Sequence, residues 1–203
     1  LLDISTAPAR EIMQRMIANV DIVVTNILDH TAKRMGVTHQ QLQAINPTII
    51  SSQGSAWGGS FRGGWEGRAG TDPGIQAEIG IQALYSSSEW PQYFSTGAVV
   101  DSITGVAVAF SSLLGVWQRR TTGYAGEARA SLVRGCSYFQ LPWMIKKDTI
   151  CDWDEPRGQG ALGESWYQRL YQCADEWIYV AARETQASLL VETVLGHPEG
   201  DEE

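Results

Sequence analysis

Apolar and polar positions along residues 1–135 follow two different periods. Short apolar runs typical of buried strands cover residues 21–26, 47–53 and 127–133, whereas the segments between them repeat apolar side chains every three or four residues, as helices do. Strands that alternate with helices predict an α/β fold whose strands run parallel. We expect a partial doubly wound, Rossmann-like layer.

Local signals mark the ends of several helices. Residues 27–36 predict a helix that ends at Gly36, and Thr38 is a suitable N-cap for the next one. Another helix is predicted from about Pro73 to Ser86. The longest helix is predicted directly after Asp101, because apolar side chains recur there at spacings of 4, 3, 1 and 3 residues: Val106, Phe110, Leu113, Leu114 and Trp117.

The pattern changes after about residue 135. We expect residues 1–135 to form an incomplete Rossmann-like core, residues 136–150 a linker helix, and residues 151–203 the start of a smaller α+β domain. Two glycine-rich segments, 54–70 and 154–164, are typical of loops, and the first has seven glycines in seventeen positions. Glycine allows such a loop to approach a ligand closely.

The formal net charge of −8 is unevenly placed along the chain. Residues 1–150 carry 12 basic and 11 acidic side chains, whereas residues 151–203 carry 3 and 12. Binding to phosphate backbones or to anionic membranes depends on clustered Lys and Arg, which this chain lacks. We therefore expect no nucleic-acid partner and no membrane partner.

Cysteine usage and the N-terminal residues indicate a reduced compartment. The chain has three cysteines, an odd number: Cys136, Cys151 and Cys173. They form no CxxC pair and have no histidine at metal-ligand spacing. We therefore expect neither a disulfide framework nor a metal site. No apolar run reaches the roughly 18–20 residues of a membrane span, and the N-terminus has no signal pattern. We expect a cytoplasmic protein.

Asp101 joins a short apolar run to the long helix, and two roles fit this position. As an N-cap, its carboxylate would accept hydrogen bonds from the first N–H groups of the helix, worth about 0.5–2 kcal/mol. As a reactive group, it would be kept ionised by the positive helix end and aimed outward from the carboxyl edge of the sheet. Such a carboxylate is a nucleophile, and the two roles are compatible.

Other chemistries lack their defining residues. Ser131 and Ser137 do not stand in a G-x-S-x-G turn, and the three histidines lie apart from any Ser or Cys pattern. Residues 54–70 contain neither a dinucleotide-binding nor a phosphate-binding glycine motif. A hydrolase triad, a Rossmann dinucleotide site and a P-loop are therefore not expected.

Five stretches occur in the order found in one known family: residues 1–26, 32–58, 67–80, 99–133 and 166–182. Together they resemble the class III CoA-transferases, which include formyl-CoA and carnitine-CoA transferases and α-methylacyl-CoA racemase. The resemblance extends over almost the whole chain, and "DSITG" after Val100 is similar to the transferase form of the motif.

This resemblance implies that Asp101 attacks an acyl-CoA thioester and forms a mixed anhydride. The released CoA thiolate then forms an aspartyl-CoA thioester, and an acceptor carboxylate takes the CoA. No tightly bound cofactor is implied, since coenzyme A or acyl-CoA is the substrate, and a homodimer is implied. The resemblance also implies further site residues by position. Asp72 is the acidic neighbour of the nucleophile. The residues expected to bind CoA are Asn26, Arg34 and Arg68, and Gly158 and Gly160 belong to a loop expected to cover the nucleophile.

Departures from the family pattern leave alternatives open. Thr71 stands where racemases carry a histidine base, which disfavours racemisation. The family's R-P-G segment is replaced within residues 27–30, and the second glycine loop is thinner. Family members also extend beyond both ends of the matched stretches, so we expect a piece of a longer enzyme or a truncated relative. The alternatives to a CoA-transferase are a non-catalytic binding or assembly module and, third, an acyl-CoA racemase.

Overall fold

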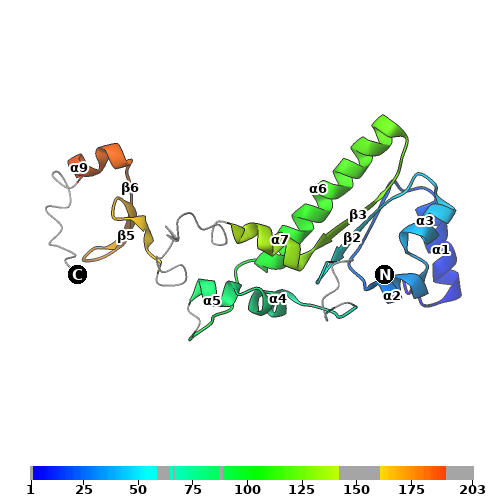
Figure 1. The fold of residues 1–203 in the computed structure, drawn as a ribbon, viewed down its shortest axis with the longest axis horizontal. Coiled ribbons are helices and arrows are strands. Elements are labelled where there is room, and N and C mark those ends of the chain that lie inside the picture. The colour runs from blue at the N-terminus through cyan, green and yellow to red at the C-terminus, as the bar shows by residue number, and fades with distance from the viewer. Residues whose placement is uncertain (1, 59–64, 66, 87–88, 142–160, 191–203) are drawn as a thin grey trace. The chain divides into compact units, whose positions relative to one another are not determined.

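The structure, a computed structural model, describes residues 2–58, 65, 67–86, 89–141 and 161–190 (Figure 1). The chain divides into two compact units, Leu1–Cys151 and Asp152–Glu203. Each unit contains a three-stranded sheet, parallel in the first unit and antiparallel in the second. The α/β class expected from the sequence is confirmed.

The parallel sheet has the order β1-β2-β3, formed by Ile22–Thr25, Ile50–Ser55 and Glu127–Ser131. Both outer strands run parallel to β2, so the carboxyl ends of all three strands meet at one edge. All three strands were predicted, although the third ends two residues early because α7 (Leu132–Phe139) begins there with Ser131 as its N-cap.

The N-terminal helices are α1 (Ala7–Ile17), α2 (Asp29–Met35) and α3 (His39–Ile45). As predicted, α2 ends at Gly36, whose φ is 80°, and Thr38 caps α3 by accepting a hydrogen bond from the Gln41 N–H. A buried apolar cluster holds these helices together: Ile17, Ala32, Val37, Leu42 and Ile49.

Helices cover both faces of β2. On one face, His39 of α3 lies 2.8 Å from the hydroxyl of Ser51. On the other face lies α6 (Val99–Thr122), whose Ser112 hydroxyl is 2.7 Å from that of Ser52. Neighbouring strand residues point to opposite faces, so this part of the layer is wound on both sides.

The buried face of α6 differs from the apolar stripe predicted from the sequence. Its buried side chains are Val100, Thr104, Val108 and Ser112, whereas the stripe is 50–70% exposed: Val106, Phe110, Leu113, Leu114 and Trp117. Small and hydroxyl-bearing residues let the helix approach the sheet closely. A Cβ at Gly115, for example, would lie only 2.8 Å from Ile50 Cγ2.

Because α6 is apolar on its outer face as well, it meets the length and hydropathy of a membrane span, with a mean hydropathy of 1.8 over 18 residues. This corrects the expectation that no segment reaches that threshold. The same helix packs on β2 and β3, as a core helix of an α/β layer does.

The segment predicted as one helix from Pro73 to Ser86 forms two: α4 (Asp72–Glu78) and α5 (Ile81–Tyr85). Gly80 lies between them with a φ of 81°, a conformation that interrupts a helix. The second unit contains β4 (Gly163–Ser165), β5 (Gln168–Gln172), β6 (Trp177–Ala181), a 3₁₀ turn at Glu184–Gln186 and α9 (Ala187–Leu190).

Candidate functional site

A cleft of about 1260 Å³ opens at the carboxyl edge of the parallel sheet. Its walls come from the segments that follow β1 and β2, from the start of α4 and from the first turns of α6. This is the edge at which α/β sheets bind ligands. The residues used below that line it are Asn26, Asp29, Arg68, Asp72, Tyr93, Asp101 and Arg129.

Asp101 is exposed in the first turn of α6 and does not cap that helix. The helix begins at Val99, and the preceding residue, Ala98, takes the N-cap position with no side-chain cap. Gly97 and Ala98 both have left-handed backbones, with φ values of 65° and 44°. The predicted N-cap role is therefore wrong, and the turn at these two residues places Asp101 on the cleft.

A different carboxylate caps α6. Asp72, the first residue of α4, accepts hydrogen bonds through Oδ2 from the N–H of Val100 at 2.8 Å and from the N–H of Asp101 at 3.1 Å. Asp72 is only 3% exposed. A negative charge at a helix N-terminus is stabilised by the orphan N–H groups and the helix dipole. Asp72 thereby fixes the backbone of the residue that the sequence singled out.

The other oxygen of Asp72 is also occupied. Gln76 donates to Oδ1 through Nε2 at 2.6 Å, and the Tyr93 hydroxyl lies 3.4 Å from the same oxygen. The backbone of Phe94 holds Gln76 in turn. Gln76 Nε2 donates to the Phe94 carbonyl at 3.0 Å, and Gln76 Oε1 accepts from the Phe94 N–H at 3.0 Å. With both oxygens engaged, Asp72 is suited to holding α6 in place and not to attacking a substrate.

The surroundings raise the pKa of Asp101 above its usual value. Partial burial of the carboxyl is the larger cause, and the negative charge of Asp72 is the second. Desolvation and the nearby like charge thus act against the stabilisation of the anion that was expected from the helix end. Nearby, burial and the charge of Asp72 raise the pKa of the Cys136 thiol to about 11.

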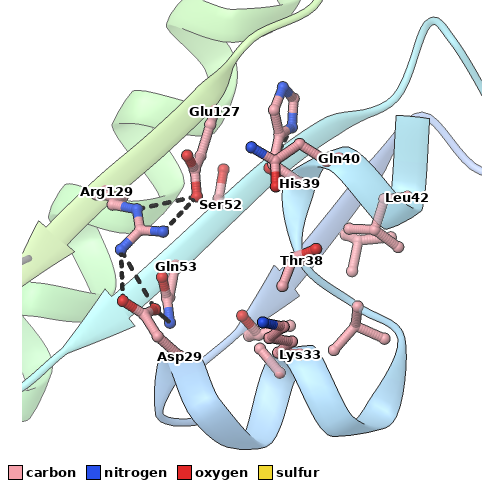
Figure 2. Close-up of a pocket in the computed structure, with 15 residues that line it drawn as sticks. Asp29, Lys33, Thr38, His39, Gln40, Leu42, Ser52, Gln53, Glu127 and Arg129 are labelled. Carbon is pink, nitrogen blue, oxygen red and sulfur yellow. Dashed lines mark hydrogen bonds and ion pairs between the residues drawn. The ribbon is translucent and has the colours of Figure 1, made fainter. Parts of the chain in front are cut away.

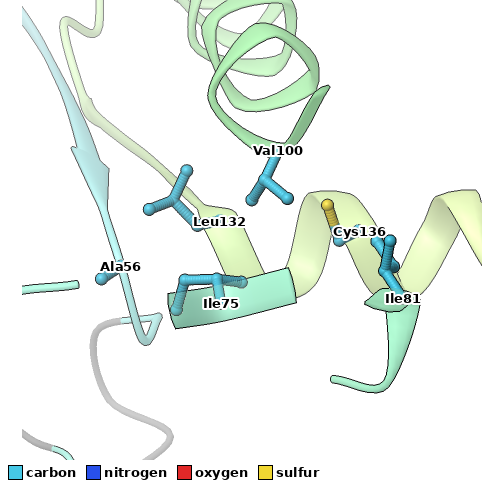
Figure 3. Packing of buried hydrophobic residues seen from close by; sticks show 6 residues of the cluster. All are labelled: Ala56, Ile75, Ile81, Val100, Leu132 and Cys136. Atoms are coloured by element: carbon cyan, nitrogen blue, oxygen red, sulfur yellow. The ribbon is translucent and has the colours of Figure 1, made fainter. Parts of the chain in front are cut away.

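An apolar cluster joins α4, α6 and α7 near the two carboxylates, and Figure 3 shows its six side chains. Val100 of α6, Ile75 of α4 and Cys136 of α7 are fully buried in it, together with Ala56, Ile81 and Leu132. Since Val100 precedes Asp101 and Ile75 lies three residues after Asp72, packing of these two side chains in the cluster fixes the distance between the starts of α4 and α6. The positions of Asp72 and Asp101 in the site thus depend on packing in the apolar core.

A second polar network lies at the opposite wall, beside a smaller pocket (Figure 2). Arg129 contacts Asp29 at 3.2 Å and Glu127 at 2.8 Å, and Gln53 donates to Asp29 at 3.0 Å. Burial raises the pKa of Asp29, but the hydrogen bonds from Gln53 and Arg129 and the positive charge of Arg129 outweigh it, so the net pKa is lowered. One positive side chain thus pairs with two negative ones in this network.

The cleft brings together some of the residues predicted for the site. Asn26 and Arg68 line it, and the Arg68 guanidinium lies 5.0 Å from the centre of the Trp65 ring. Arg34 is exposed on α2 and does not line the cleft. Gly158 and Gly160 lie outside the described residues.

Sequence reasoning missed Gln76 and Tyr93. Gln76 stands four residues after Asp72, a spacing at which side chains on one helix meet, so that signal was available. Tyr93 lies in a loop with no local pattern, and only the tertiary structure brings it to Asp72. In the described part of the chain, no group of three or more His, Cys, Asp or Glu side chains could hold a metal ion.

Comparisons with known proteins identify the family of the chain. The sequence model of CoA-transferase family III matches residues 1–203. The chain is 27% identical over 190 residues to the CoA-transferase/lyase DddD of Marinomonas sp. The aligned residues cover 94% of this chain and 23% of that protein. It is 22% identical over 199 residues to the succinyl-CoA--D-citramalate CoA-transferase of Chloroflexus aurantiacus, covering 98% of this chain and 49% of that one.

Solved structures show a similar fold. The crystal structure of Rv3272 from M. tuberculosis gives a TM-score of 0.75 at 20% identity, over 94% of this chain and 49% of that one. A CAIB/BAIF family protein from Brucella suis gives 0.71 at 22% identity, over 94% and 50%. The chain thus spans half or less of the length of these proteins.

Proposed function

Since the chain belongs to CoA-transferase family III, we propose that its cleft takes part in moving CoA from an acyl-CoA to a carboxylic acid, with Asp101 as the nucleophile. One observation carries this proposal. Asp101 is an exposed carboxylate at the carboxyl edge of the sheet, on a helix end that the buried Asp72 holds in place.

In the proposed reaction, a carboxylate oxygen of Asp101 attacks the thioester carbonyl carbon. The C–S bond breaks, which gives a mixed anhydride and CoA thiolate. The thiolate then attacks the Asp101 carbonyl carbon, the acyl group leaves as a carboxylate, and CoA remains on Asp101 as a thioester. An acceptor carboxylate repeats the two steps in reverse, leaves as its own CoA thioester and restores the Asp101 carboxylate.

The roles of the other residues follow from their contacts. Asp72 is a positioning residue, because both of its oxygens already accept hydrogen bonds. The raised pKa of Asp101 makes its anion less stabilised and therefore more reactive, while the reaction still requires the ionised form. Asn26 and Arg68 are the proposed CoA contacts. Gly158 and Gly160 remain predictions for the loop over the nucleophile.

The experiment that tests the proposal is trapping of the intermediate. The chain is mixed with acetyl-CoA, succinyl-CoA or octanoyl-CoA, and the intact mass of the protein is measured before and after hydroxylamine treatment. We expect an added CoA that hydroxylamine removes, located at Asp101 by peptide mapping. Asp101→Asn should give no adduct, whereas Ser102→Ala, a neighbour on the same helix turn, should retain it. An adduct at another residue would contradict the proposal.

A second candidate, an assembly module without catalysis, is favoured by the exposed apolar stripe on α6. Phe110 is 62% exposed and Trp117 is 67% exposed. Exposed apolar area of this kind marks an interaction surface. We propose a homodimer that covers it. Sedimentation should then show a dimer for the unmodified chain and a monomer for Phe110→Gln/Trp117→Gln; a monomeric unmodified chain would contradict this.

A further inference from the structure

Tyr93 lies beside Asp72, the carboxylate that holds the start of α6, without being firmly engaged there. Its hydroxyl is 3.4 Å from Asp72 Oδ1, the oxygen that Gln76 already contacts at 2.6 Å. A hydrogen bond of 3.4 Å between oxygens is much longer than the usual 2.7–2.8 Å. The phenol hydrogen is therefore available to another acceptor, and Tyr93 lines the cleft with 41% of its surface exposed.

This end of the cleft presents a difficulty for one of the two substrates. The acceptor is a carboxylate, and it must approach Asp101 next to the buried charge of Asp72. Like charges repel across a partly desolvated site. Of the arginines that line the cleft, Arg129 is engaged by Asp29 and Glu127, and Arg68 lies over Trp65.

A neutral donor avoids part of this difficulty. Desolvation is the largest cause that raises the pKa of Tyr93. The charge of Asp72, the hydrogen bond between Tyr93 and Asp72, and the charge of Asp101 raise it further. Its hydroxyl thus stays protonated across the physiological range and can donate. One carboxylate, Asp72, joins the Tyr93 hydroxyl to the N–H of Asp101, so the donor and the nucleophile are neighbours.

We propose that Tyr93 binds the acceptor carboxylate by donating its phenol hydrogen to one of the acceptor oxygens while the other attacks the Asp101 thioester. This inference rests on the proposed CoA transfer. Tyr93 keeps its proton throughout, the C–S bond to CoA breaks, and the new C–O bond forms the second mixed anhydride. The acid released from the donor acyl-CoA leaves Asp101 through the reverse of this step, so the same contact serves its departing carboxylate.

Separate measurement of the two half-reactions tests this role. The aspartyl-CoA adduct is formed with whichever of acetyl-CoA, succinyl-CoA and octanoyl-CoA labels the chain fastest, and its discharge is followed with acetate, succinate or octanoate. For Tyr93→Phe we expect adduct formation and discharge by the carboxylate both to slow about 10- to 100-fold, the range for losing a hydrogen bond to a charged group, because the two half-reactions pass through the same steps in opposite directions.

Two controls separate this role from a structural one. Hydroxylamine carries no carboxylate, so it should discharge the Tyr93→Phe adduct at the unmodified rate. Tyr124→Phe, a tyrosine beyond the far end of α6, should change neither half-reaction. Unchanged discharge by carboxylates in Tyr93→Phe, or discharge by hydroxylamine slowed as much as discharge by carboxylates, would overturn the inference alone. Absence of any adduct in the unmodified chain would overturn the proposed function together with it.

Discussion

The two walls of the cleft treat their carboxylates in opposite ways. At the start of α6, Asp101 lies near a second negative charge, and its pKa is raised. At the opposite wall, Asp29 lies against Arg129 and Gln53, and its pKa is lowered. The residue type and the cleft are shared, so the difference comes from the neighbours alone.

This difference separates a reactive carboxylate from a structural one. A lowered pKa means that the anion is already stabilised by the protein, and such an anion is a weak nucleophile. A raised pKa means that the anion is stabilised less than in water. The wall with Asp72 therefore suits covalent chemistry, whereas the wall with Arg129 suits the joining of β3 to the start of α2.

The largest expected effect is on covalent labelling. Asp101→Asn should lower the rate of CoA adduct formation by at least about 1000-fold, as removal of a nucleophile does. Asp29→Asn, the matched change at the other wall, should stay within about fivefold of the unmodified rate, because that carboxylate is held by Arg129. Rates from intact-mass time courses decide this. Equal losses in both variants would erase the contrast between the walls.

Removal of the buried carboxylate should destabilise the fold. Asp72→Ala leaves the N–H groups of Val100 and Asp101 without their acceptor, and we expect a loss of about 3 kcal/mol in the free energy of unfolding. Urea denaturation measures it. Asp21→Ala, which removes an exposed carboxylate paired with Arg119, should cost less than about 1 kcal/mol. A cost for Asp72→Ala no larger than this control would refute the capping role.

Neutralising Asp72 should also change how Asp101 titrates. Asp72→Asn removes the like charge, so the pKa of Asp101 should fall, as followed by carboxyl ¹³C NMR. Because the folded pKa of Asp101 is raised above that of the unfolded chain, its contribution to stability is present at acid pH. That contribution is lost as the pH rises from the unfolded value through the raised one. An unaltered titration in Asp72→Asn would mean that burial alone causes the shift.

The smallest effect is expected at the other wall. Arg129→Gln should raise the pKa of Asp29 and change the free energy of unfolding by less than about 1 kcal/mol at neutral pH, because the pair is solvent-exposed. The lowered pKa of Asp29 stabilises the fold above the unfolded pKa, and this stabilisation is lost as the pH falls through the lowered value. Arg129→Gln should weaken that acid-side dependence. A pKa of Asp29 that stays low without Arg129 would assign the shift to Gln53 instead.

Much of the layer was predictable because its signals are local. Gly36 and Thr38 end and begin helices through their own backbone and side-chain chemistry, so their roles could be inferred without tertiary contacts. The parallel strands were marked by short apolar runs. The cytoplasmic location and the racemase alternative are not tested by these features, and the location remains a prediction.

The stripe on α6 shows where a local signal misled. Side chains such as Phe110 and Trp117 predict a buried face, but Gly115 and Ser112 meet the strand instead, because a helix that lies directly on a sheet needs small residues at the contact. Periodicity locates a helix and says nothing of which face its neighbours cover.

By itself, the sequence determined the α/β class, the parallel strands and the position of one carboxylate at the start of a long helix, since each depends on residues that are close along the chain. Only the tertiary structure decided that Asp72, 29 residues away, caps that helix. It also placed Tyr93 beside the same carboxylate and put Arg34 outside the cleft. Hydrogen bonding and like-charge repulsion act over a few ångströms in space, and distance along the chain does not reveal them.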